Sequence, residues 1–276
     1  MSAGSPWERH ARQWSLVGPP LRPAAQDVAF AGAAIDAWRR DTGRDDLTFL
    51  LMGVTPELCR IPTSDRSRLI AADRSLDMIR AVWPGRVRDR DRVLCGDWRD
   101  LPLRSATVDI VLADGCLTNI PFPGGYRRIC GEIRRVMRPD GRWVARAFVQ
   151  ADRRETVAAV LADTRDGRAG GFHAWKWRLA MALQADAEAG VRVADVWDAL
   201  HRAHEDIGEL ARTCQWPVEV VRTIDAYRGV ETRYSFPTLE ALRDVFLAEG
   251  FAVRDVSTPS YELGDRCPTL HLSPRS

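Results

Sequence analysis

The sequence has 276 residues, of which 45% are hydrophobic and 28% charged, and its formal net charge is +2. This composition is typical of a globular protein that buries a substantial core. It holds no apolar run long enough to span a membrane, and the small net charge indicates no basic face for nucleic acid. The first residues lack the apolar core of a signal peptide, so we expect a cytoplasmic protein. The six cysteines form no Cys-x-x-Cys pair, which favours reduced, structural thiols.

Residues 6–23 predict a short helix followed by an extended, proline-rich segment. Trp7, Ala11 and Trp14 fall at spacings of i, i+4 and i+7, which places them on one helical face. This helix either folds over a ligand site as a lid or buries its tryptophans against the sheet, and the pattern favours neither. Arg22 in the extended segment is a candidate for binding a carboxylate. The next helix is expected over 26–41 and closes at Gly43.

A strand that ends in a glycine organises the next part of the chain. Residues 47–52 form a short apolar run, which suits a strand buried on both faces of a parallel sheet, and Gly53 ends it. Pro56 suits the first turn of a helix. A second strand over 68–72 ends in Asp73, 20 residues after Gly53, and a helical pattern follows over 74–83. Nucleotide-type folds hold a ribose diol with an acid at this spacing, although a strand-end Asp also serves as a helix N-cap.

Three further strands and one amphipathic helix extend this pattern. The strands are expected over 92–98, 108–114 and 142–146, with the helix over 126–137 before the last of them. The segments that carry the pattern read GDWRDLPLRSATVDIVLADG (96–115) and EIRRVMRPDGRWVARAF (132–148). In this order, the motifs over 47–147 resemble those of class I, Rossmann-like S-adenosylmethionine-dependent methyltransferases of the small-molecule type.

The resemblance implies S-adenosylmethionine as the cofactor and S-adenosylhomocysteine as its product. The first loop departs from the family, because it keeps only Gly53 where the family pattern has three glycines. A nicotinamide dinucleotide needs a glycine-rich turn around its pyrophosphate, whereas S-adenosylmethionine has no phosphate, so the loop argues against a dehydrogenase. The cofactor-binding residues that the resemblance implies are Gly53, Val54, Thr55, Asp73, Arg74, Met78, Gly96, Asp97, Trp98, Asp114, Gly115 and Cys116.

Three of these positions have alternative roles. The resemblance gives Asp97 a hydrogen bond to the adenine amino group and Trp98 a place over the ring. Otherwise Asp97 caps a turn and Trp98 packs in the core. Cys116 is expected to line the pocket as a thiol, since methyl transfer from a sulfonium needs no covalent enzyme intermediate. The loop after 108–114 lacks an Asn-Pro-Pro-Tyr type of signature, which further disfavours a nucleic-acid substrate.

Residues 151–232 predict a helical insertion, with helices over 155–163, 175–188, 194–212 and 218–227. Because the fifth strand ends at the ligand-binding edge of the sheet, so long an excursion predicts a cap over that edge. The run 172–178 joins aromatic and cationic side chains, which suits a flat or anionic substrate or, equally, a core-facing helix with snorkelling cations. His201 and His204 lack a third ligand, so no metal is expected. The candidate substrate-binding residues are Trp14, Arg22, Asn119, Phe172, Trp175 and Lys176.

The end of the chain returns to the sheet. Thr238 is expected to cap a helix over 239–247, and strands over 251–256 and 267–272 are expected to close the sheet. The predicted fold class is α/β, with a seven-stranded, mostly parallel sheet, an antiparallel C-terminal edge hairpin and a helical cap insertion. Its expected parts are 1–45 (N-terminal helical lid and first sheet-packing helix), 46–150 (cofactor-binding core), 151–232 (cap insertion) and 233–276 (C-terminal helix and closing strands).

The sequence thus predicts a methyltransferase that moves a methyl group to an O or N atom of a small molecule, mainly by holding donor and acceptor in line. An acceptor hydroxyl of high pKa needs a base, for which His173 is the first candidate, with Tyr234, Tyr261 and His10 behind it. No nucleic-acid or membrane partner is expected, and the protein is expected to be a monomer or homodimer. The alternative is a non-catalytic S-adenosylmethionine-binding protein, because the first loop is poor in glycine.

Overall fold

The computed structural model describes residues 6–61 and 63–275, without the side chains of Pro6, Trp7 and His10. The roles expected of Trp7 and His10 therefore lie outside the described residues.

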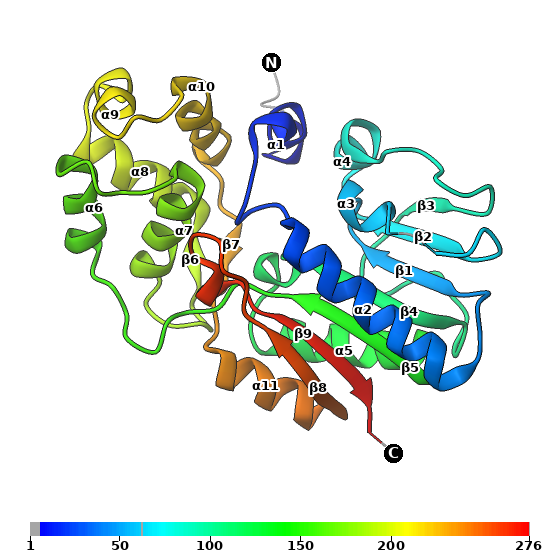
Figure 1. The fold of residues 1–276 in the computed structure, drawn as a ribbon. Coiled ribbons are helices and arrows are strands. Elements are labelled where there is room, and N and C mark those ends of the chain that lie inside the picture. Colours follow the sequence, from blue (N-terminus) through cyan, green and yellow to red (C-terminus); the bar gives the residue numbers. More distant parts are fainter. Residues whose placement is uncertain (1–5, 62, 276) are drawn as a thin grey trace.

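Seven strands form the central sheet, in the order β3-β2-β1-β4-β5-β9-β8 (Figure 1). They are β1 (Thr48–Met52), β2 (Arg68–Asp73), β3 (Arg92–Cys95), β4 (Val108–Asp114), β5 (Met137–Arg146), β8 (Phe251–Ser257) and β9 (Thr269–Pro274). β9 runs opposite to the other six strands of this sheet, between β5 and the edge strand β8. The predicted α/β fold with a mostly parallel sheet and a C-terminal edge hairpin is thereby confirmed.

The central strands are buried on both faces because their side chains alternate between two helical layers. Leu50 and Met52 of β1 pack into one apolar cluster with α5 (Gly124–Val136) and α11 (Leu239–Ala248). Phe49 and Leu51 pack into the opposite layer, which α2 (Ala25–Thr42), α3 (Pro56–Cys59) and α4 (Leu76–Val82) supply. An apolar run without alternation is what a strand in this position requires.

Local capping sets several element ends. The Ser75 hydroxyl accepts a hydrogen bond from Met78 N at the start of α4, and Thr238 caps α11 as predicted. The fifth strand begins earlier than the expected residue 142, because Met137 already pairs with Val108 before the register shifts. Residues 138–141 therefore form an irregularity within β5 rather than a separate turn before it.

The helical insertion follows β5 and contains more breaks than the sequence predicted. It holds α6 (Val157–Arg165), α7 (Phe172–Leu183), α8 (Val193–Ala203), α9 (Ile207–Thr213), α10 (Val218–Val221) and the 3₁₀ helix η3 (Arg222–Tyr227). The single helix expected over 194–212 is two helices, because His204 is extended and the Asp206 side chain caps α9. The short pair β6 (Val191–Arg192) and β7 (Arg233–Tyr234) was not predicted. The proposed four-part division of the chain stays a prediction.

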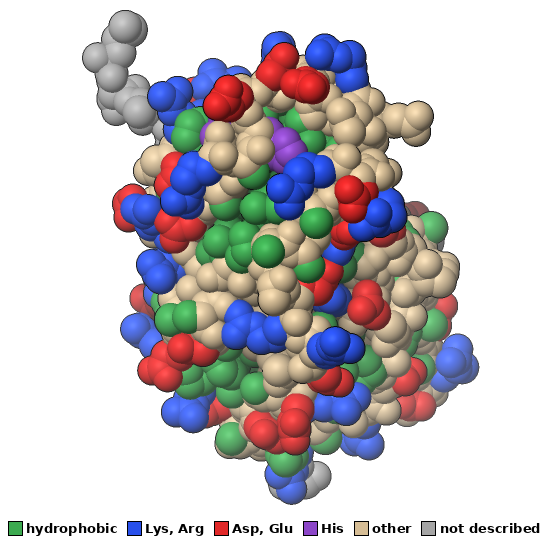
Figure 2. Space-filling view, turned by 90° about the vertical axis from the view of Figure 1, so that its left-hand side faces the viewer, with side chains coloured by type: hydrophobic (Ala, Val, Ile, Leu, Met, Phe, Trp, Pro, Cys, Tyr) green, Lys and Arg blue, Asp and Glu red, His purple; other side chains and the backbone are tan. Residues whose placement is uncertain are grey.

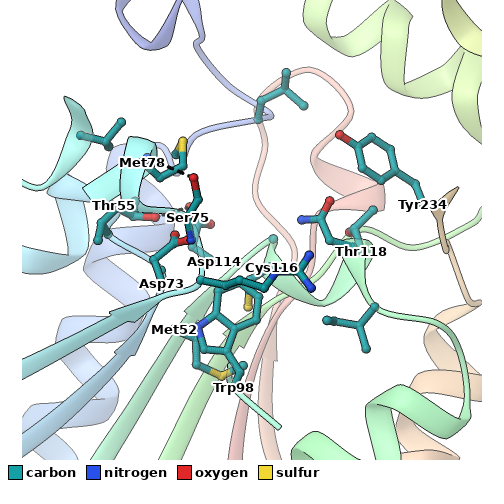
Figure 3. Close-up of a pocket in the computed structure, with 18 of the residues that line it drawn as sticks. Met52, Thr55, Asp73, Ser75, Met78, Trp98, Asp114, Cys116, Thr118 and Tyr234 are labelled. Atoms are coloured by element: carbon teal, nitrogen blue, oxygen red, sulfur yellow. Dashed lines mark hydrogen bonds between the residues drawn. The ribbon is translucent and has the colours of Figure 1, made fainter. Parts of the chain in front are cut away.

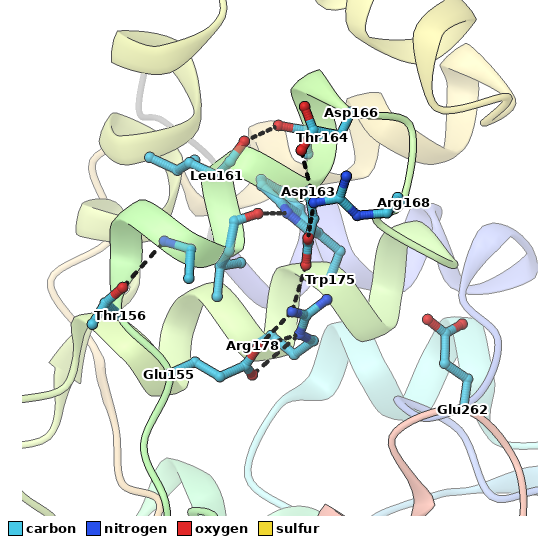
Figure 4. Close-up of polar contacts among 12 residues, drawn as sticks. Glu155, Thr156, Leu161, Asp163, Thr164, Asp166, Arg168, Trp175, Arg178 and Glu262 are labelled. Carbon is cyan, nitrogen blue, oxygen red and sulfur yellow. Dashed lines mark hydrogen bonds and ion pairs between the residues drawn. The ribbon is translucent and has the colours of Figure 1, made fainter.

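One guanidinium ties the first two helices of the insertion together (Figure 4). Arg178 of α7 donates from Nε to Glu155 Oε1 at 3.0 Å and pairs through Nη2 with Asp163 Oδ2 of α6 at 2.7 Å. Trp175 of α7 also donates from Nε1 to Val160 O at 3.0 Å. These bonds fix the face of α7 that packs against α6.

The N-terminal segment connects the two parts of the molecule. Helix α1 (Pro6–Arg12) contacts both α4 and η3, and the 3₁₀ helix η1 (Trp14–Leu16) follows it. Figure 1 shows α1 between the insertion on one side and α4 with the sheet on the other. The segment from η1 to α2, residues 14–23, is called the strap below.

The surface of the insertion mixes charges of both signs. Figure 2 views the molecule from this side, and Lys and Arg alternate there with Asp and Glu without one sign dominating. Among the described residues, no helix is long and apolar enough to cross a membrane.

Candidate active site

A large cavity opens at the carboxyl ends of β1, β2 and β4 (Figure 3). It encloses about 1130 Å³ of space between atoms, its open mouth included. Parallel strands of an open α/β sheet place their ligand sites at this edge. The strap and the insertion complete the wall, so the cavity lies between the sheet and the helical part.

The turn after β1 forms the floor of the cavity with a single glycine. Gly53 has φ = +100°, which only glycine adopts without strain, and its N–H donates to Ala72 O at 2.7 Å. Val54 and Thr55 are buried, and the Thr55 hydroxyl lies 3.5 Å from Asp114 Oδ2. Contacts with β2 and β4 thus hold the loop, and its backbone conformation requires no glycine other than Gly53.

The end of β2 presents a carboxylate to the cavity. Asp73 Oδ1 accepts a hydrogen bond from Ser75 N at 2.8 Å, and burial raises the pKa of this carboxyl. Ser75 and Met78 line the same side of the cavity, where Figure 3 shows them beside Asp73. Arg74 also lines the cavity. This side therefore offers an anionic acceptor next to an apolar surface.

The loop after β3 brings an indole to the cavity wall. Trp98 Nε1 donates to Ala72 O at 2.6 Å, which fixes the ring plane against the end of β2. Asp97 lines the cavity as well, but Arg99 holds its carboxylate through Nε at 2.9 Å and lowers its pKa to about 2. Contrary to expectation, Gly96, directly before Asp97, is partly exposed and is not among the residues that line the cavity.

The end of β4 carries a buried ion pair. Arg146 Nε of β5 lies 2.5 Å from Asp114 Oδ1, and both side chains are almost completely buried. Burial lowers the pKa of the Arg146 guanidinium, but the nearby Asp114 carboxylate raises it by more, so the net shift is upward. Arg146 also donates from Nη1 to Pro20 O of the strap at 2.7 Å. The pair therefore joins two sheet strands and the strap beside the cavity.

The two residues that follow Asp114 in the chain, Gly115 and Cys116, both line the cavity. Gly115 has φ = +61°, and a Cβ atom there would come within 2.6 Å of the Phe148 ring. Cys116 is buried, and burial raises the pKa of its thiol, so it remains protonated and serves as part of the wall. Thr118, Asn119 and Ile120 continue the lining.

Aromatic side chains form the opposite side of the cavity, which Figure 3 marks by Tyr234. Phe148, Trp177, Tyr227 and Tyr234, called the aromatic box below, all line it. The Phe148–Trp177 and Trp177–Tyr234 ring centroids lie 5.2 Å apart, edge to face. The Tyr227 and Tyr234 ring centroids lie 6.0 Å apart, edge to face, and burial raises the pKa of both hydroxyls, that of Tyr234 to about 12. The box is therefore neutral at physiological pH.

Two of the expected site residues bind the protein itself instead of facing the cavity. His173 Nε2 donates to Leu16 O at 2.9 Å, and burial, with the nearby charge of Lys176, lowers the His173 pKa to about 4. It does not line the cavity, so the geometry is against its expected role as base. Arg22 is also outside the lining, because its Nε donates to Glu57 Oε1 at 2.9 Å.

The other three expected substrate residues on α7 lie behind the wall. Phe172 and Trp175 belong to the core of the insertion, and Trp175 is fully buried. Lys176 is 1% exposed and stands over the Tyr227 ring. None of the three lines the cavity. Trp177, one residue further along the helix, is the residue of this run that does, so the expectation had the wrong helical face.

Most other expected residues line the cavity: Trp14, Gly53, Val54, Thr55, Asp73, Arg74, Met78, Asp97, Trp98, Asp114, Gly115, Cys116, Asn119 and Tyr234. Sequence reasoning missed Leu21, Met52, Ser75, Val82, Thr118, Ile120, Phe148, Trp177 and Tyr227. Met52 and Ser75 could have been predicted as lining residues, because they are the direct neighbours of the expected residues Gly53 and Arg74. Nothing in the sequence places Phe148 and Tyr227 on one cavity wall, because the packing of the insertion decides their positions.

Residues 53–145 match the protein family described as a methyltransferase domain. No curated protein matched the chain. Among solved structures, a provisionally assigned zinc-dependent alcohol dehydrogenase from Rhodobacter sphaeroides superposes with a TM-score of 0.59 and 14% identity, covering 98% of this chain and 97% of that one. At this identity the likeness shows the fold alone. Among the described residues, no group of three or more His, Cys, Asp or Glu is placed to hold a metal.

Two further structures share the fold. A chain of the Haloferax volcanii complex between the Trm112 methyltransferase activator and its assigned methyltransferase gives a TM-score of 0.53 at 12% identity, covering 100% of both chains. An S-adenosylmethionine-dependent methyltransferase from Methanosarcina mazei gives 0.50 at 13% identity, covering 84% of this chain and 94% of that one. The family match runs from the end of β1 into β5, so the chain carries a methyltransferase domain over residues 53–145, within the class I methyltransferase fold that these structures share.

Proposed function

We propose that the protein transfers a methyl group from S-adenosylmethionine to an O or N atom of a small molecule that binds in the cavity. S-adenosylmethionine supplies an electrophilic methyl group on a sulfonium. The observation that carries the proposal is the cavity itself, which joins a polar side at the strand ends to an aromatic side from the insertion. A donor and an acceptor can thus be held in one enclosed space, where alignment and exclusion of water provide the rate enhancement.

The side at the strand ends fits the cofactor by the chemistry of its residues. Asp73 offers carboxylate oxygens for the ribose hydroxyls, and the pinned Trp98 ring and Met78 offer apolar surface for the adenine. The turn at Gly53 leaves open space where a Cβ would stand, which suits close approach of the amino-acid end. The other proposed cofactor residues are Val54, Thr55, Arg74, Asp97, Asp114, Gly115 and Cys116, all of which line the cavity, whereas Gly96 does not.

The acceptor is proposed to lie against the aromatic box, with Trp14 and Asn119 beside it. The titratable groups on this side, Cys116, Tyr227 and Tyr234, all have raised pKa values and so hold their protons at neutral pH. They are poor bases. We therefore propose an acceptor that is nucleophilic without enzymatic deprotonation, such as a neutral amine, a carboxylate or an acidic hydroxyl, with Tyr234 orienting it.

Titration calorimetry with S-adenosylhomocysteine, S-adenosylmethionine and NAD⁺ tests the cofactor site. We expect both sulfur compounds to bind and NAD⁺ not to bind, because the turn lacks a phosphate cradle. A radiolabelled-methyl assay over amines, phenols and carboxylic acids then tests transfer. Binding without transfer to any of these compounds would favour the alternative, a non-catalytic S-adenosylmethionine-binding protein, for which the glycine-poor turn is the supporting feature.

We further propose a cytoplasmic protein that works as a monomer or homodimer on small molecules, without a nucleic-acid or membrane partner. The support is the small net charge and the mixture of charges over the insertion (Figure 2). Light scattering after size-exclusion chromatography measures the oligomeric state. Methylation of a nucleic-acid substrate in the same labelled assay would refute the small-molecule class.

A further inference from the structure

A buried ammonium that no described carboxylate pairs with lies behind the acceptor side of the cavity. Lys176 is 1% exposed, and its Nζ lies 4.8 Å from the centroid of Tyr227 and 5.5 Å from that of Phe172. Among the described residues it has no ion pair, and burial alone lowers its pKa, to about 7. A buried charge normally has a partner, because desolvation is costly. Here the part of the chain that the structure describes supplies two aromatic rings in place of a carboxylate.

The position of this ammonium relates it to the cavity. The Tyr227 ring that it faces belongs to the cavity wall, so one aromatic ring separates the charge from the bound acceptor. The Tyr227 ring lies edge to face with that of Tyr234, 6.0 Å between centroids, and Figure 3 shows the Tyr234 hydroxyl directed toward the cavity. A positive charge against the Tyr227 ring polarises the two neighbouring hydroxyls and strengthens them as donors. An oxygen anion is the partner that such a donor favours most.

The aromatic box alone leaves the charge of the acceptor open. Four aromatic rings suit a flat ring by stacking and edge contacts, and they suit an organic cation equally well. Lys176 decides between these, because a second positive charge one ring away repels a cation and attracts an anion. Three carboxylates line the cavity: Asp73, Asp97 and Asp114. Asp73 lies on the side opposite Tyr234 (Figure 3). Asp97 is paired with Arg99, and Asp114 with Arg146.

We propose that the acceptor is a flat aromatic anion, a carboxylate or an acidic phenol, that stacks in the aromatic box with its charged oxygen at Tyr234, and that Lys176 is the positioning residue that selects the negative charge. This inference rests on the proposed function and adds the substrate class. Methyl transfer to such an oxygen forms an O–C bond with an oxygen lone pair, while the S–C bond breaks and its electron pair stays on sulfur. The negative and positive charges disappear together, so the step needs no base.

Three matched probes test the charge selection in protein saturated with S-adenosylhomocysteine: 2-naphthoate, 2-naphthamide and 2-naphthylmethylammonium. Tryptophan fluorescence reports binding, since Trp177 and Trp14 line the cavity. We expect the naphthoate to bind at least about tenfold more tightly than either other probe. Equal affinities, tighter binding of the ammonium, or no binding of any probe would overturn the inference.

The variant Lys176→Met removes the charge and keeps an unbranched apolar chain, so it should fold. It should reduce the naphthoate preference to about threefold or less and leave the affinities for naphthamide and S-adenosylhomocysteine nearly unchanged. Tyr227→Phe keeps the ring and removes only the hydroxyl, and should also weaken naphthoate binding. Arg202→Met, which removes an exposed charge from α8, is the control and should behave as the wild type.

The outcomes separate the two proposals. Failure of S-adenosylhomocysteine to bind would contradict the proposed function. Normal S-adenosylhomocysteine binding with an unchanged naphthoate preference in Lys176→Met would leave that function standing and overturn the inference alone.

Discussion

Single residues set the polarity of this cavity, and two of them carry charges that burial makes expensive. Asp73 lies at the end of β2 with a raised pKa, and Lys176 lies behind Tyr227 with a lowered one. Both shifts have desolvation as their largest cause, so both side chains gain from a ligand of opposite or hydrogen-bonding character. Groups of this kind in a cleft or directly behind its wall are candidates for function, and each can be tested separately.

Replacing Asp73 with Ala should weaken S-adenosylhomocysteine binding by about tenfold or more. Hydrogen bonds from ribose hydroxyls to a carboxylate contribute about 1.5–3 kcal/mol each. Titration calorimetry measures the change, and circular dichroism checks that the sheet persists. Asp65→Ala, at an exposed carboxylate just before β2, is the matched control. An unchanged dissociation constant in folded Asp73→Ala would show that another residue holds the ribose.

Lys176 makes stability depend on pH in a predictable direction. Its pKa is about 7 in the folded protein against 10.5 for a free lysine side chain. Between these values the unfolded chain binds a proton that the folded protein lacks, so the contribution of Lys176 to stability rises with pH there. At pH 7 and below, Lys176→Met should therefore be the more stable protein, and its advantage should shrink by about 1.4 kcal/mol per pH unit above that.

Urea unfolding of both proteins from about pH 7 to about pH 9 measures this difference. The groups that face Lys176 cancel in the comparison: His173, with a pKa of about 4, is neutral across the range, and Tyr227 keeps its proton because burial raises its pKa. A stability difference that does not change with pH would show that the ammonium titrates as in water.

The sequence was informative about residues whose place depends on a strand end. Asp73 and Asp114 follow apolar runs directly, and both line the cavity as expected. It was not informative about His173, whose partner is the carbonyl of Leu16, 157 residues away in the chain. Lys176 was expected to touch the substrate, but the face of a helix buried on nearly all sides cannot be read from its periodicity.

At the scale of elements, the junction of β4 and β5 determines the shape of the site. Asp114 and Arg146 are register partners at the ends of these parallel strands, and their side chains form the buried ion pair. Gly115 follows immediately in a left-handed conformation and lets the Phe148 ring approach. The ion pair therefore fixes the point where the chain turns from the sheet into the cavity lining.

Arg146→Leu should destabilise the fold by about 3–5 kcal/mol, because it leaves the Asp114 carboxylate buried without a partner. It also removes the bond to the Pro20 carbonyl. Urea unfolding without ligand measures the loss, and Arg142→Leu on the same strand, whose closest carboxylate lies 3.7 Å from its guanidinium at an exposed Asp41, is the milder control. A loss below about 1 kcal/mol would mean that Asp114 takes up a proton at little cost.

Helices and strands were predicted correctly where a single hydrophobic pattern, apolar run or helical repeat, continued without interruption. The apolar strands β1 and β4 and the Thr238-capped α11 occur where expected. It failed in the insertion, where the Asp206 cap divides one expected helix into α8 and α9. The pair β6–β7 is only two residues long on each side, which is too short to show alternation.

At the scale of the whole molecule, three apolar clusters meet around the cavity, and the strap crosses between them. Two clusters cover the faces of the sheet and the third fills the insertion. The strap contacts all three regions through separate polar bonds: Leu16 with α7, Pro20 with β5, and Arg22 with α3. The sequence predicted a helical lid from Trp7 and Trp14 and left a simple packing role open, because these contacts join residues far apart in the chain.

The last prediction follows from the way the strap is held. Arg22 pairs with Glu57, and its guanidinium also lies 5.1 Å from the centroid of the Trp14 ring. In Arg22→Met the Glu57 carboxylate loses this ion pair. Its other oxygen, Oε2, is already buried and has no hydrogen-bond partner among the described residues. Hydration of that carboxylate then competes with closure of the strap. Because Trp14 and Leu21 line the cavity, opening should expose both and loosen the bound cofactor.

Chymotrypsin should therefore cleave Arg22→Met near Trp14 and Leu21 faster than the wild type, and saturating S-adenosylhomocysteine should slow that cleavage in both proteins. The dissociation constant for S-adenosylhomocysteine should rise several-fold, while the unfolding midpoint changes little because the sheet keeps its own contacts. Arg12→Met removes an exposed ion pair with Glu8 on α1 and should leave cleavage and affinity at wild-type values. Equal cleavage of Arg22→Met and Arg12→Met would show that apolar packing, and not the Arg22–Glu57 pair, holds the strap over the cavity.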